Sequence, residues 1–175
     1  MRRKLLTLLV LACLVLVGVG AIWLQHERDI VRRIDCLSVL RSTGFSFSMY
    51  RQDHNGQLPE NFSLMSNVVS DCRLYVCPWG SKKPGSWTNI TEWMDYFYVY
   101  WPSVTGVYTN YPLMYDRRLS NHGGKGINVL LVDVVNRYEG IRGPTFWFLD
   151  EDAKWLRKFA REHPNVKIPL PEDVK

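Results

Sequence analysis

The chain has 175 residues, of which 46% are hydrophobic and 22% are charged, and its formal net charge is +5. Three of its positive charges are Arg2, Arg3 and Lys4, whereas basic and acidic residues nearly balance from His54 onward. This length allows one modest domain with a single core beside any membrane segment. Because that domain has no basic excess to neutralise phosphates, we do not expect nucleic acid as a partner.

An uncharged, mostly apolar run extends from Leu5 to Leu24, directly after the three basic residues. Twenty residues in an α-helix rise about 30 Å, which matches the hydrocarbon core of a bilayer. The sequence therefore predicts an N-terminal membrane anchor over residues 1–24.

Two other interpretations of this run stay open. A cleaved secretory signal also starts with basic residues, and Val19-Gly20-Ala21 offers small residues for a signal peptidase. A lipoprotein signal would end at Cys13, after Val10-Leu11-Ala12. A retained anchor is favoured because the apolar run is longer than a usual signal core, continues well beyond Cys13, and carries Trp23 where an interfacial anchor belongs.

Residues 25–54 are predicted to form the soluble half of the same helix. Apolar or small residues recur there at intervals of three and four, which is typical of one face of a helix. They are Ile30, Ile34, Leu37, Leu40, Gly44, Phe47 and Tyr50. Asp53-His54-Asn55-Gly56 and then Pro59 predict that the helix ends near residue 54.

Residues 55–175 are predicted to form a small globular domain. Residues 60–74 favour a short helix or turn, and the composition from Trp79 to Trp93 is typical of a loop. Strands are expected at residues 96–101, 113–116 and 127–133, with a hairpin return at 136–139. A last helix opens at Asp150-Glu151-Asp152, shows Trp155, Leu156 and Phe159 on one face, and closes before Pro164. The predicted fold class is α+β.

Several segments together resemble the type IV pilin-like proteins, in particular the bacterial pseudopilins similar to type II secretion system protein G. The matching segments are Cys36 to Gly44, Met49 to Glu60, Cys77-Pro78, Tyr96 to Tyr98, and Ser120 to Asp133. The resemblance implies a pilin-like fold, in which a long N-terminal helix has its first half embedded in the membrane and its second half packed on a small antiparallel sheet.

The resemblance also implies a function and a place in the cell. The protein would be a non-catalytic subunit of a type II secretion or type IV pilus-type assembly, with other pilin-like subunits or secretion-system proteins as partners. It would cross the bacterial inner membrane once, with its C-terminal domain on the periplasmic side. The competing interpretation is a membrane-tethered binding module for glycan or protein that keeps the pilin fold without forming filaments.

The sequence departs from the family at the membrane border and at a turn. The family has Gly-Phe-Thr-Leu-Ile-Glu at the border, is cut after Gly, and uses the Glu to neutralise the N-terminus of a neighbouring subunit. This chain has Leu5 to Val10 there, without the Gly or the Glu, and Asp133-Val134-Val135-Asn136 where the family has Asp-Gly-His-Val. We therefore expect an uncleaved N-terminus and a minor rather than a repeating subunit.

The resemblance further implies a disulfide between Cys36 and Cys77, because both match family positions. Cysteine count alone leaves open whether Cys36, Cys72 and Cys77 form a disulfide or stay reduced. About half of the aromatic residues lie between Tyr75 and Tyr115, more than a small sheet is expected to bury. Core filling is the expected role of most of them, but Trp79, Trp87 and Trp93, in the segment with loop composition, are the candidates for meeting a partner.

No catalytic site, cofactor or metal centre is expected. Some related pseudopilins bind calcium, and Asp116, Asp133, Asp150 and Asp152 supply suitable oxygens, but their spacing is not that of an EF-hand loop. Gly123 to Gly126 lacks the first glycine and the Ser or Thr of a phosphate-binding loop, so a flexible turn is expected there. His122 has no identifiable nucleophile beside it and is interpreted as a structural donor.

Overall fold

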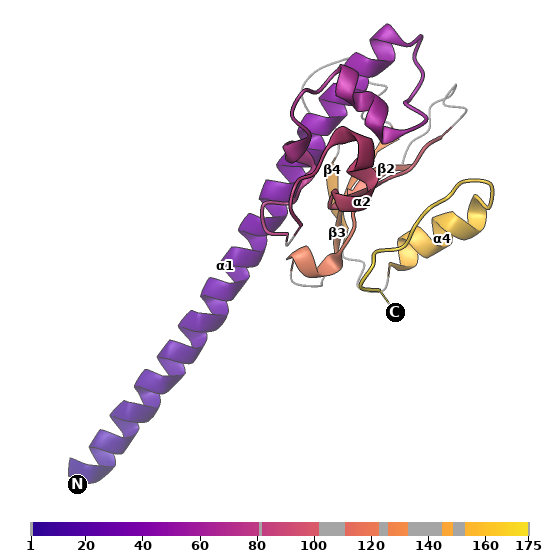
Figure 1. The fold of residues 1–175 in the computed structure, drawn as a ribbon. Helices are drawn as coiled ribbons and strands as arrows, with labels where there is room; N and C mark the ends of the chain where they lie inside the picture. Colours follow the sequence, from indigo (N-terminus) through magenta and orange to yellow (C-terminus); the bar gives the residue numbers. More distant parts are fainter. Residues whose placement is uncertain are drawn as a thin grey trace. The chain divides into compact units, whose positions relative to one another are not determined.

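The computed structural model describes residues 2–80, 82–101, 111–122, 126–132, 145–148 and 153–174. The fold is α+β, with a long N-terminal helix, α1 (Arg2–Asp53), and a four-stranded antiparallel sheet (Figure 1). The chain divides into two compact units, Met1–Val31 and Arg32–Lys175. The predicted fold class is thus confirmed.

The first unit is helical and apolar, and its described side chains from Leu6 to Leu24 are almost all exposed. Its helix is long and apolar enough to cross a membrane. A helix that is apolar on all sides needs an apolar surrounding, such as a core or a bilayer. Between Leu6 and Leu24, no face of the helix is covered by the described part of the chain.

The sheet of the second unit is a meander of neighbouring antiparallel strands in the order β1-β2-β3-β4. Its strands are β1 (Tyr96–Tyr98), β2 (Pro112–Asp116), β3 (Ile127–Leu131) and β4 (Thr145–Phe148). β1 is shorter than predicted, although Val99 N–H still donates to the Leu113 carbonyl at 2.9 Å. The strand predicted at 113–116 is confirmed, and the strand predicted at 127–133 starts where expected but ends at Leu131.

β4 pairs with β3 along its whole length, with Ile127 opposite Phe148 and Leu130 opposite Thr145. The sequence did not predict this strand. The predicted hairpin return at 136–139 and the turn at 133–136 lie outside the described residues.

Short helices join α1 to the sheet. They are η1 (Phe62–Asn67), η2 (Cys72–Tyr75), η3 (Trp87–Asn89) and α2 (Ile90–Trp93). The Asn61 and Asp71 side chains accept hydrogen bonds from the backbone N–H groups of Ser63 and Arg73, which fixes the starts of η1 and η2. The prediction for residues 60–74 is confirmed. The loop predicted between Trp79 and Trp93 is corrected, because its second half, Trp87 to Trp93, is helical.

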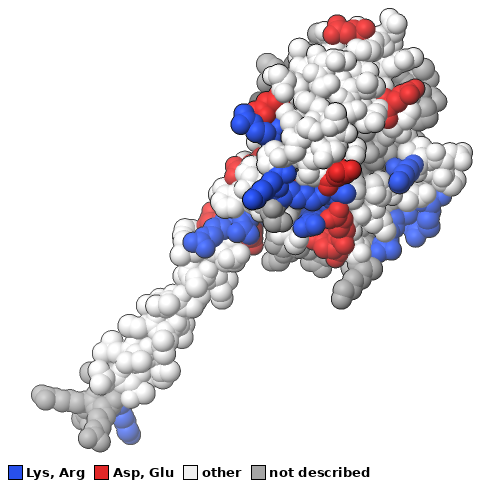
Figure 2. Space-filling view, viewed as in Figure 1, with Lys and Arg blue, Asp and Glu red and all other residues white. Residues whose placement is uncertain are grey.

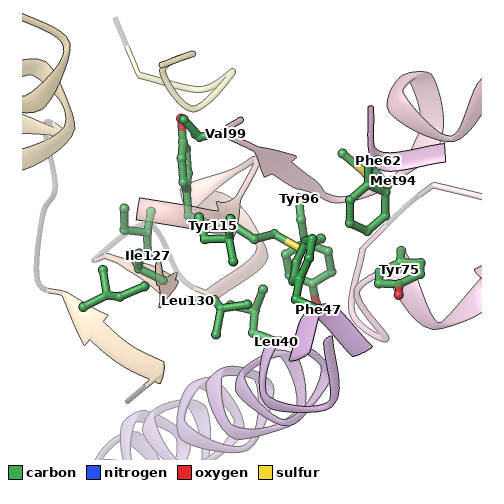
Figure 3. Packing of buried hydrophobic residues seen from close by; sticks show 14 of the residues in the cluster. Leu40, Phe47, Phe62, Tyr75, Met94, Tyr96, Val99, Tyr115, Ile127 and Leu130 are labelled. Carbon is green, nitrogen blue, oxygen red and sulfur yellow. The ribbon is translucent and has the colours of Figure 1, made fainter. Parts of the chain in front are cut away.

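The second half of α1 covers the core. Its buried face consists of Cys36, Leu40, Thr43, Gly44, Phe47 and Tyr50. Leu40 and Phe47 point from α1 into the cluster that contains Tyr96 and Leu130 (Figure 3). Ile34 was predicted to belong to this face, but its side chain is 58% exposed. That prediction was wrong because the helix presents apolar residues on two opposite sides.

The end of α1 follows the predicted stop signal. The helix ends at Asp53, after which Asn55 and Gly56 take positive φ angles of 53° and 80°. Gly56 N–H donates to the Arg51 carbonyl at 2.8 Å, and Arg51 Nε donates to the Gly56 carbonyl at 2.6 Å. These bonds satisfy backbone groups that the last helical turn leaves open.

The remaining helices are η4 (Leu119–His122) and α4 (Lys154–Glu162). α4 begins after Ala153, which has a left-handed backbone with φ of 50°, and it ends before Pro164 as predicted. Leu156 is buried while Trp155 and Phe159 are half-buried on the core. Asp150 to Asp152, predicted to open this helix, lie outside the described residues.

Candidate interaction surface

The side of α1 opposite the core is partly apolar, and it includes the exposed Arg41, which lies three positions after Ser38 and four before Phe45. Ile34, Phe45 and Met49 are 58%, 60% and 55% exposed. Positions three and four apart lie on one side of a helix, so Ser38 and Ser42 fall between these apolar residues. We call Ile34, Ser38, Ser42, Phe45 and Met49 the outer face of α1.

The serines of the outer face do not require water as a hydrogen-bond partner. Ser38 Oγ donates to the Asp35 carbonyl at 2.6 Å, and Ser42 Oγ donates to the Ser38 carbonyl at 3.0 Å. A polar group that is already hydrogen-bonded costs much less to bury than an unsatisfied one. Another helix can therefore cover the outer face without leaving these hydroxyls unpaired.

A disulfide ties this half of α1 to the segment before the loop. Cys36 and Cys77 are bonded, with their Cα atoms 5.7 Å apart, in agreement with the pairing that the resemblance implies. Both cysteines are buried. Cys72 is a half-buried free thiol whose Sγ lies 3.6 Å from the Gly85 carbonyl oxygen.

A buried carboxylate holds the backbone beside this disulfide. Cys77 N–H donates to Asp95 Oδ2 at 2.9 Å. Burial raises the pKa of Asp95, while the Cys77 hydrogen bond and the nearby Lys82 ammonium partly oppose this rise. A side chain at Gly80 would overlap the same carboxylate, so only glycine fits there. The disulfide and the Asp95 carboxylate therefore hold the Cys77 to Gly80 segment against α1.

Trp79 is the predicted partner residue that the structure places at the surface. Its side chain is 47% exposed, and Nε1 donates to Asp35 Oδ2 at 2.8 Å. The Arg32 guanidinium carbon lies 5.2 Å from the centroid of the indole ring, within cation–π range. Trp79 thus lies against α1 with part of its ring open to a partner.

Trp87 and Trp93 have mainly internal contacts. Trp87 is half-buried, 5.7 Å from the Tyr75 ring, and its Nε1 donates to the Ser70 carbonyl at 3.4 Å. Trp93 is only 8% exposed, and its Nε1 donates to the Ser86 carbonyl at 3.0 Å. The expectation that Trp93 presents a ring to a partner is corrected, because the 85–89 segment folds over it.

Of the four aspartates considered as calcium ligands, Asp116 is the one that lies among the described residues. Asp116 is buried in β2, and its Oδ2 accepts a hydrogen bond from Asn128 N–H of β3 at 2.6 Å. Asp133, Asp150 and Asp152 lie outside the described residues, as do Gly123 to Lys125 and the His122 side chain. Among the described residues, no group of three or more His, Cys, Asp or Glu is placed to hold a metal ion.

Sequence reasoning missed Phe45 and Met49 as surface residues. The sequence did contain a signal for their exposure, because both residues lie outside the predicted core face and are four positions apart.

Comparison with protein-family models, with curated proteins and with solved structures finds no match for this chain. The resemblance to pilin-like proteins therefore rests on the sequence motifs.

Proposed function

We propose that the protein is a non-catalytic, single-pass membrane subunit whose outer face of α1 packs against an apolar helix of another subunit. In this proposal it is a pseudopilin-like component of a type II secretion or type IV pilus-type assembly. It is anchored in the bacterial inner membrane with its second unit on the periplasmic side. The observation that carries the proposal is a set of exposed apolar residues, Ile34, Phe45 and Met49, on the same helix as an apolar run long enough to span a bilayer.

The energetics favour covering the outer face. Burying a Val, Leu, Ile, Phe or Met side chain contributes about 1.5–3 kcal/mol relative to leaving it exposed. Ile34, Phe45 and Met49 lie along one side of the helix, and the small Ser38 between Ile34 and Phe45 allows close approach of a neighbouring backbone. These three side chains favour an apolar helix as the partner, while the long side chain of Arg41 on the same side can keep its charged end in water at the edge of the contact.

A minor position in the assembly is supported by the N-terminal sequence. A Glu in an apolar stem is costly unless it meets a cationic group of a neighbour, so it fixes the register of a repeating filament. This chain has Val10 at that position. Its association with other subunits would then depend on the outer face of α1 and on the rest of the second unit.

Exposure of Trp79 supports the second candidate function, a membrane-tethered module that binds glycan or protein. Aromatic rings with one open side are common anchors in binding sites. In that case Trp79 would contact the ligand, and the outer face of α1 would not be needed for binding.

Site-specific cross-linking tests the proposal. In a chain with Cys13→Ser and Cys72→Ser, a Ser38→Cys substitution places one reactive thiol in the outer face and leaves the Cys36–Cys77 disulfide intact. This thiol is labelled with a benzophenone maleimide, whose photo-excited ketone inserts into C–H bonds of any neighbouring chain and so needs no thiol on the partner. We expect discrete hetero-complexes after illumination in membranes, and their loss when Phe45→Glu and Met49→Lys are added.

Leu74→Cys in the same background is the matched control, because Leu74 is 52% exposed and belongs to η2 rather than to the outer face of α1. Equal cross-linking at both positions, or none at Ser38→Cys, would contradict the proposed helix contact. An extended ladder of homo-oligomers would instead contradict the minor position.

A further inference from the structure

The C-terminal segment is bound to the rest of the second unit as an extended peptide. We call residues 168–174 the strap. Ile168 is 8% exposed, the Tyr115 hydroxyl donates to the Pro169 carbonyl at 2.5 Å, and Glu172 N–H donates to the Arg117 carbonyl at 2.9 Å. Pro169 and Pro171 restrict φ and so favour an extended backbone.

Two successive carboxylates of the strap each meet two donors. Glu172 accepts hydrogen bonds from Arg117 Nε at 2.5 Å and Arg118 Nε at 2.9 Å. Asp173 accepts from the backbone N–H groups of Leu119 at 2.9 Å and Ser120 at 2.7 Å. We call the residues that receive the strap the acceptor: Tyr115, Arg117, Arg118, Leu119 and Ser120. Basic and acidic side chains lie side by side on this unit (Figure 2).

The central arginine of the acceptor is held by residues outside the strap. Arg117 Nη1 donates to the Thr91 carbonyl at 2.9 Å and the Met94 carbonyl at 3.3 Å. Its guanidinium carbon lies 4.9 Å from the centroid of the Phe97 ring, and its side chain is only 16% exposed. These contacts orient the guanidinium whether or not a carboxylate is present.

Tyr115 and the two backbone donors are likewise fixed by the fold. Tyr115 is a buried residue of β2, paired with Phe97 of β1 and Val129 of β3. Leu119 and Ser120 are the first residues of η4, which is separated from the end of β2 by two residues. The acceptor is therefore built by the sheet and its neighbouring turns, and the strap occupies it as a ligand joined to the same chain.

We propose that the acceptor is a binding site for an extended peptide of a partner chain that carries two consecutive acidic residues after a proline, and that the strap fills this site in cis. Charge complementarity selects such a ligand: two arginines take the first carboxylate and two backbone N–H groups take the second. Lys82 contributes a further positive charge near Glu172. The inference does not depend on the proposed membrane assembly.

The same contacts stabilise the ionised strap carboxylates. Burial alone raises the pKa of Glu172, but hydrogen bonds from Arg118 and Arg117 outweigh it and hold this pKa below its usual value. A tethered ligand competes with a free one at an effective concentration in the millimolar range. A partner peptide therefore binds well only when the strap is displaced or weakened.

A peptide-binding experiment on the full-length chain tests the proposal. The probe is a fluorescently labelled peptide with the sequence of residues 166–174, and the protein carries Glu172→Ala and Asp173→Ala to weaken the strap. By fluorescence anisotropy, we expect this variant to bind the probe at least about tenfold more tightly than the unaltered chain does, which follows from loss of the tethered competitor.

Two matched controls test whether the probe is recognised through its carboxylates and through Arg118 of the acceptor. A probe with Gln and Asn in place of its Glu and Asp should bind at least about tenfold more weakly, since both charge-assisted contacts are lost. Adding Arg118→Ala to the strap variant should weaken binding of the original probe. Equal affinity for both probes, or no binding by a variant that retains the melting temperature of a folded domain, would overturn the proposal.

Two further outcomes are informative. If the double variant does not fold, the Glu172→Gln variant, which keeps the side-chain shape, is used with the same probes. If that variant also fails to fold, the acceptor is not formed independently of the strap, and the proposal is wrong. A dimer of the unaltered chain that is lost in the Glu172→Ala and Asp173→Ala variant would identify a second copy as the donor of the peptide.

Discussion

Gly85 determines how the loop before η3 packs on Trp93. A Cβ atom at this position would lie 2.6 Å from Cδ1 and Nε1 of the Trp93 ring. The ring cannot move away easily, because Nε1 is hydrogen-bonded to the Ser86 carbonyl and to Asn89 Oδ1. We therefore expect Gly85→Ala to lower the free energy of unfolding by about 1–3 kcal/mol, the usual cost of overpacking.

Chemical denaturation of the purified chain measures this loss. Lys83→Ala is the matched control, because Lys83 is exposed in the same loop and should change stability by less than about 0.5 kcal/mol. A Gly85→Ala variant as stable as the control would show that the loop does not hold Trp93 in the way described.

Buried tyrosines couple the stability of the second unit to alkaline pH. Burial raises the pKa of Tyr75 to about 12, partly offset by hydrogen bonds from Thr43 and Ser46, and it raises the pKa of Tyr98 and Tyr115 further. Each group is more easily ionised in the unfolded chain, with a pKa of about 10. Their contribution to stability is therefore complete below about pH 10 and falls as the pH rises.

A spectrophotometric titration checks this dependence. The buried tyrosines should ionise in a steep step above pH 10 that coincides with the loss of near-ultraviolet circular dichroism. A single smooth ionisation of all tyrosines in the folded chain would contradict the described burial.

At the scale of elements, the disulfide joins α1 to the segment that leads into the sheet. Cys36 and Cys77 are separated by 41 positions in the sequence. Closing a loop of this length contributes roughly 4 kcal/mol in the chain-entropy model. We expect Cys36→Ser with Cys77→Ser to lower the free energy of unfolding by about this amount.

Cys72→Ser is the control for the disulfide variant. Its thiol is free and half-buried, so its replacement should change stability by less than about 1 kcal/mol. Peptide mapping without reduction should also recover Cys36 and Cys77 in one linked pair. Recovery of Cys72 in the linked pair would contradict the assignment.

Elements with strong local signals were predicted well from the sequence. The end of α1 follows from His54, Asn55 and Gly56, because Asn and Gly accept positive φ. The strands at 113–116 and 127–131 follow from apolar and β-branched residues. β4 was missed because hairpin reasoning favours the nearest later segment as the partner of β3, whereas the actual partner starts at Thr145.

The candidate sites were predicted less well, because they depend on which surfaces meet. Apolar residues on both sides of α1 satisfy a helical spacing, so the pattern could not show that Leu40 faces the sheet while Ile34 faces outward. The burial of Trp93 depends on the close approach of Gly85. The contact between Arg117 and Glu172 joins residues 55 positions apart, which local patterns do not reveal.

At the scale of the whole molecule, the chain combines a folded unit that has its own core with a helical unit that has none. Residues of the first unit such as Leu14, Leu16 and Ile22 are 62%, 71% and 74% exposed. A continuous apolar surface of this kind is not stable in water, and its length matches a bilayer. Membrane insertion is thus the simplest way to cover it.

Charged substitutions within the span test this conclusion. An arginine near the centre of a transmembrane helix costs about 2.5–3.5 kcal/mol on the insertion scale. Leu14→Arg with Leu16→Arg should therefore move much of the protein from the carbonate-resistant membrane fraction to the extractable fraction. Leu64→Arg with Leu74→Arg adds the same charges at exposed positions of the second unit and should leave the protein in the membrane. If both double variants fractionate alike, the apolar run does not anchor the chain, because only an inserted helix distinguishes charge inside the span from charge outside it.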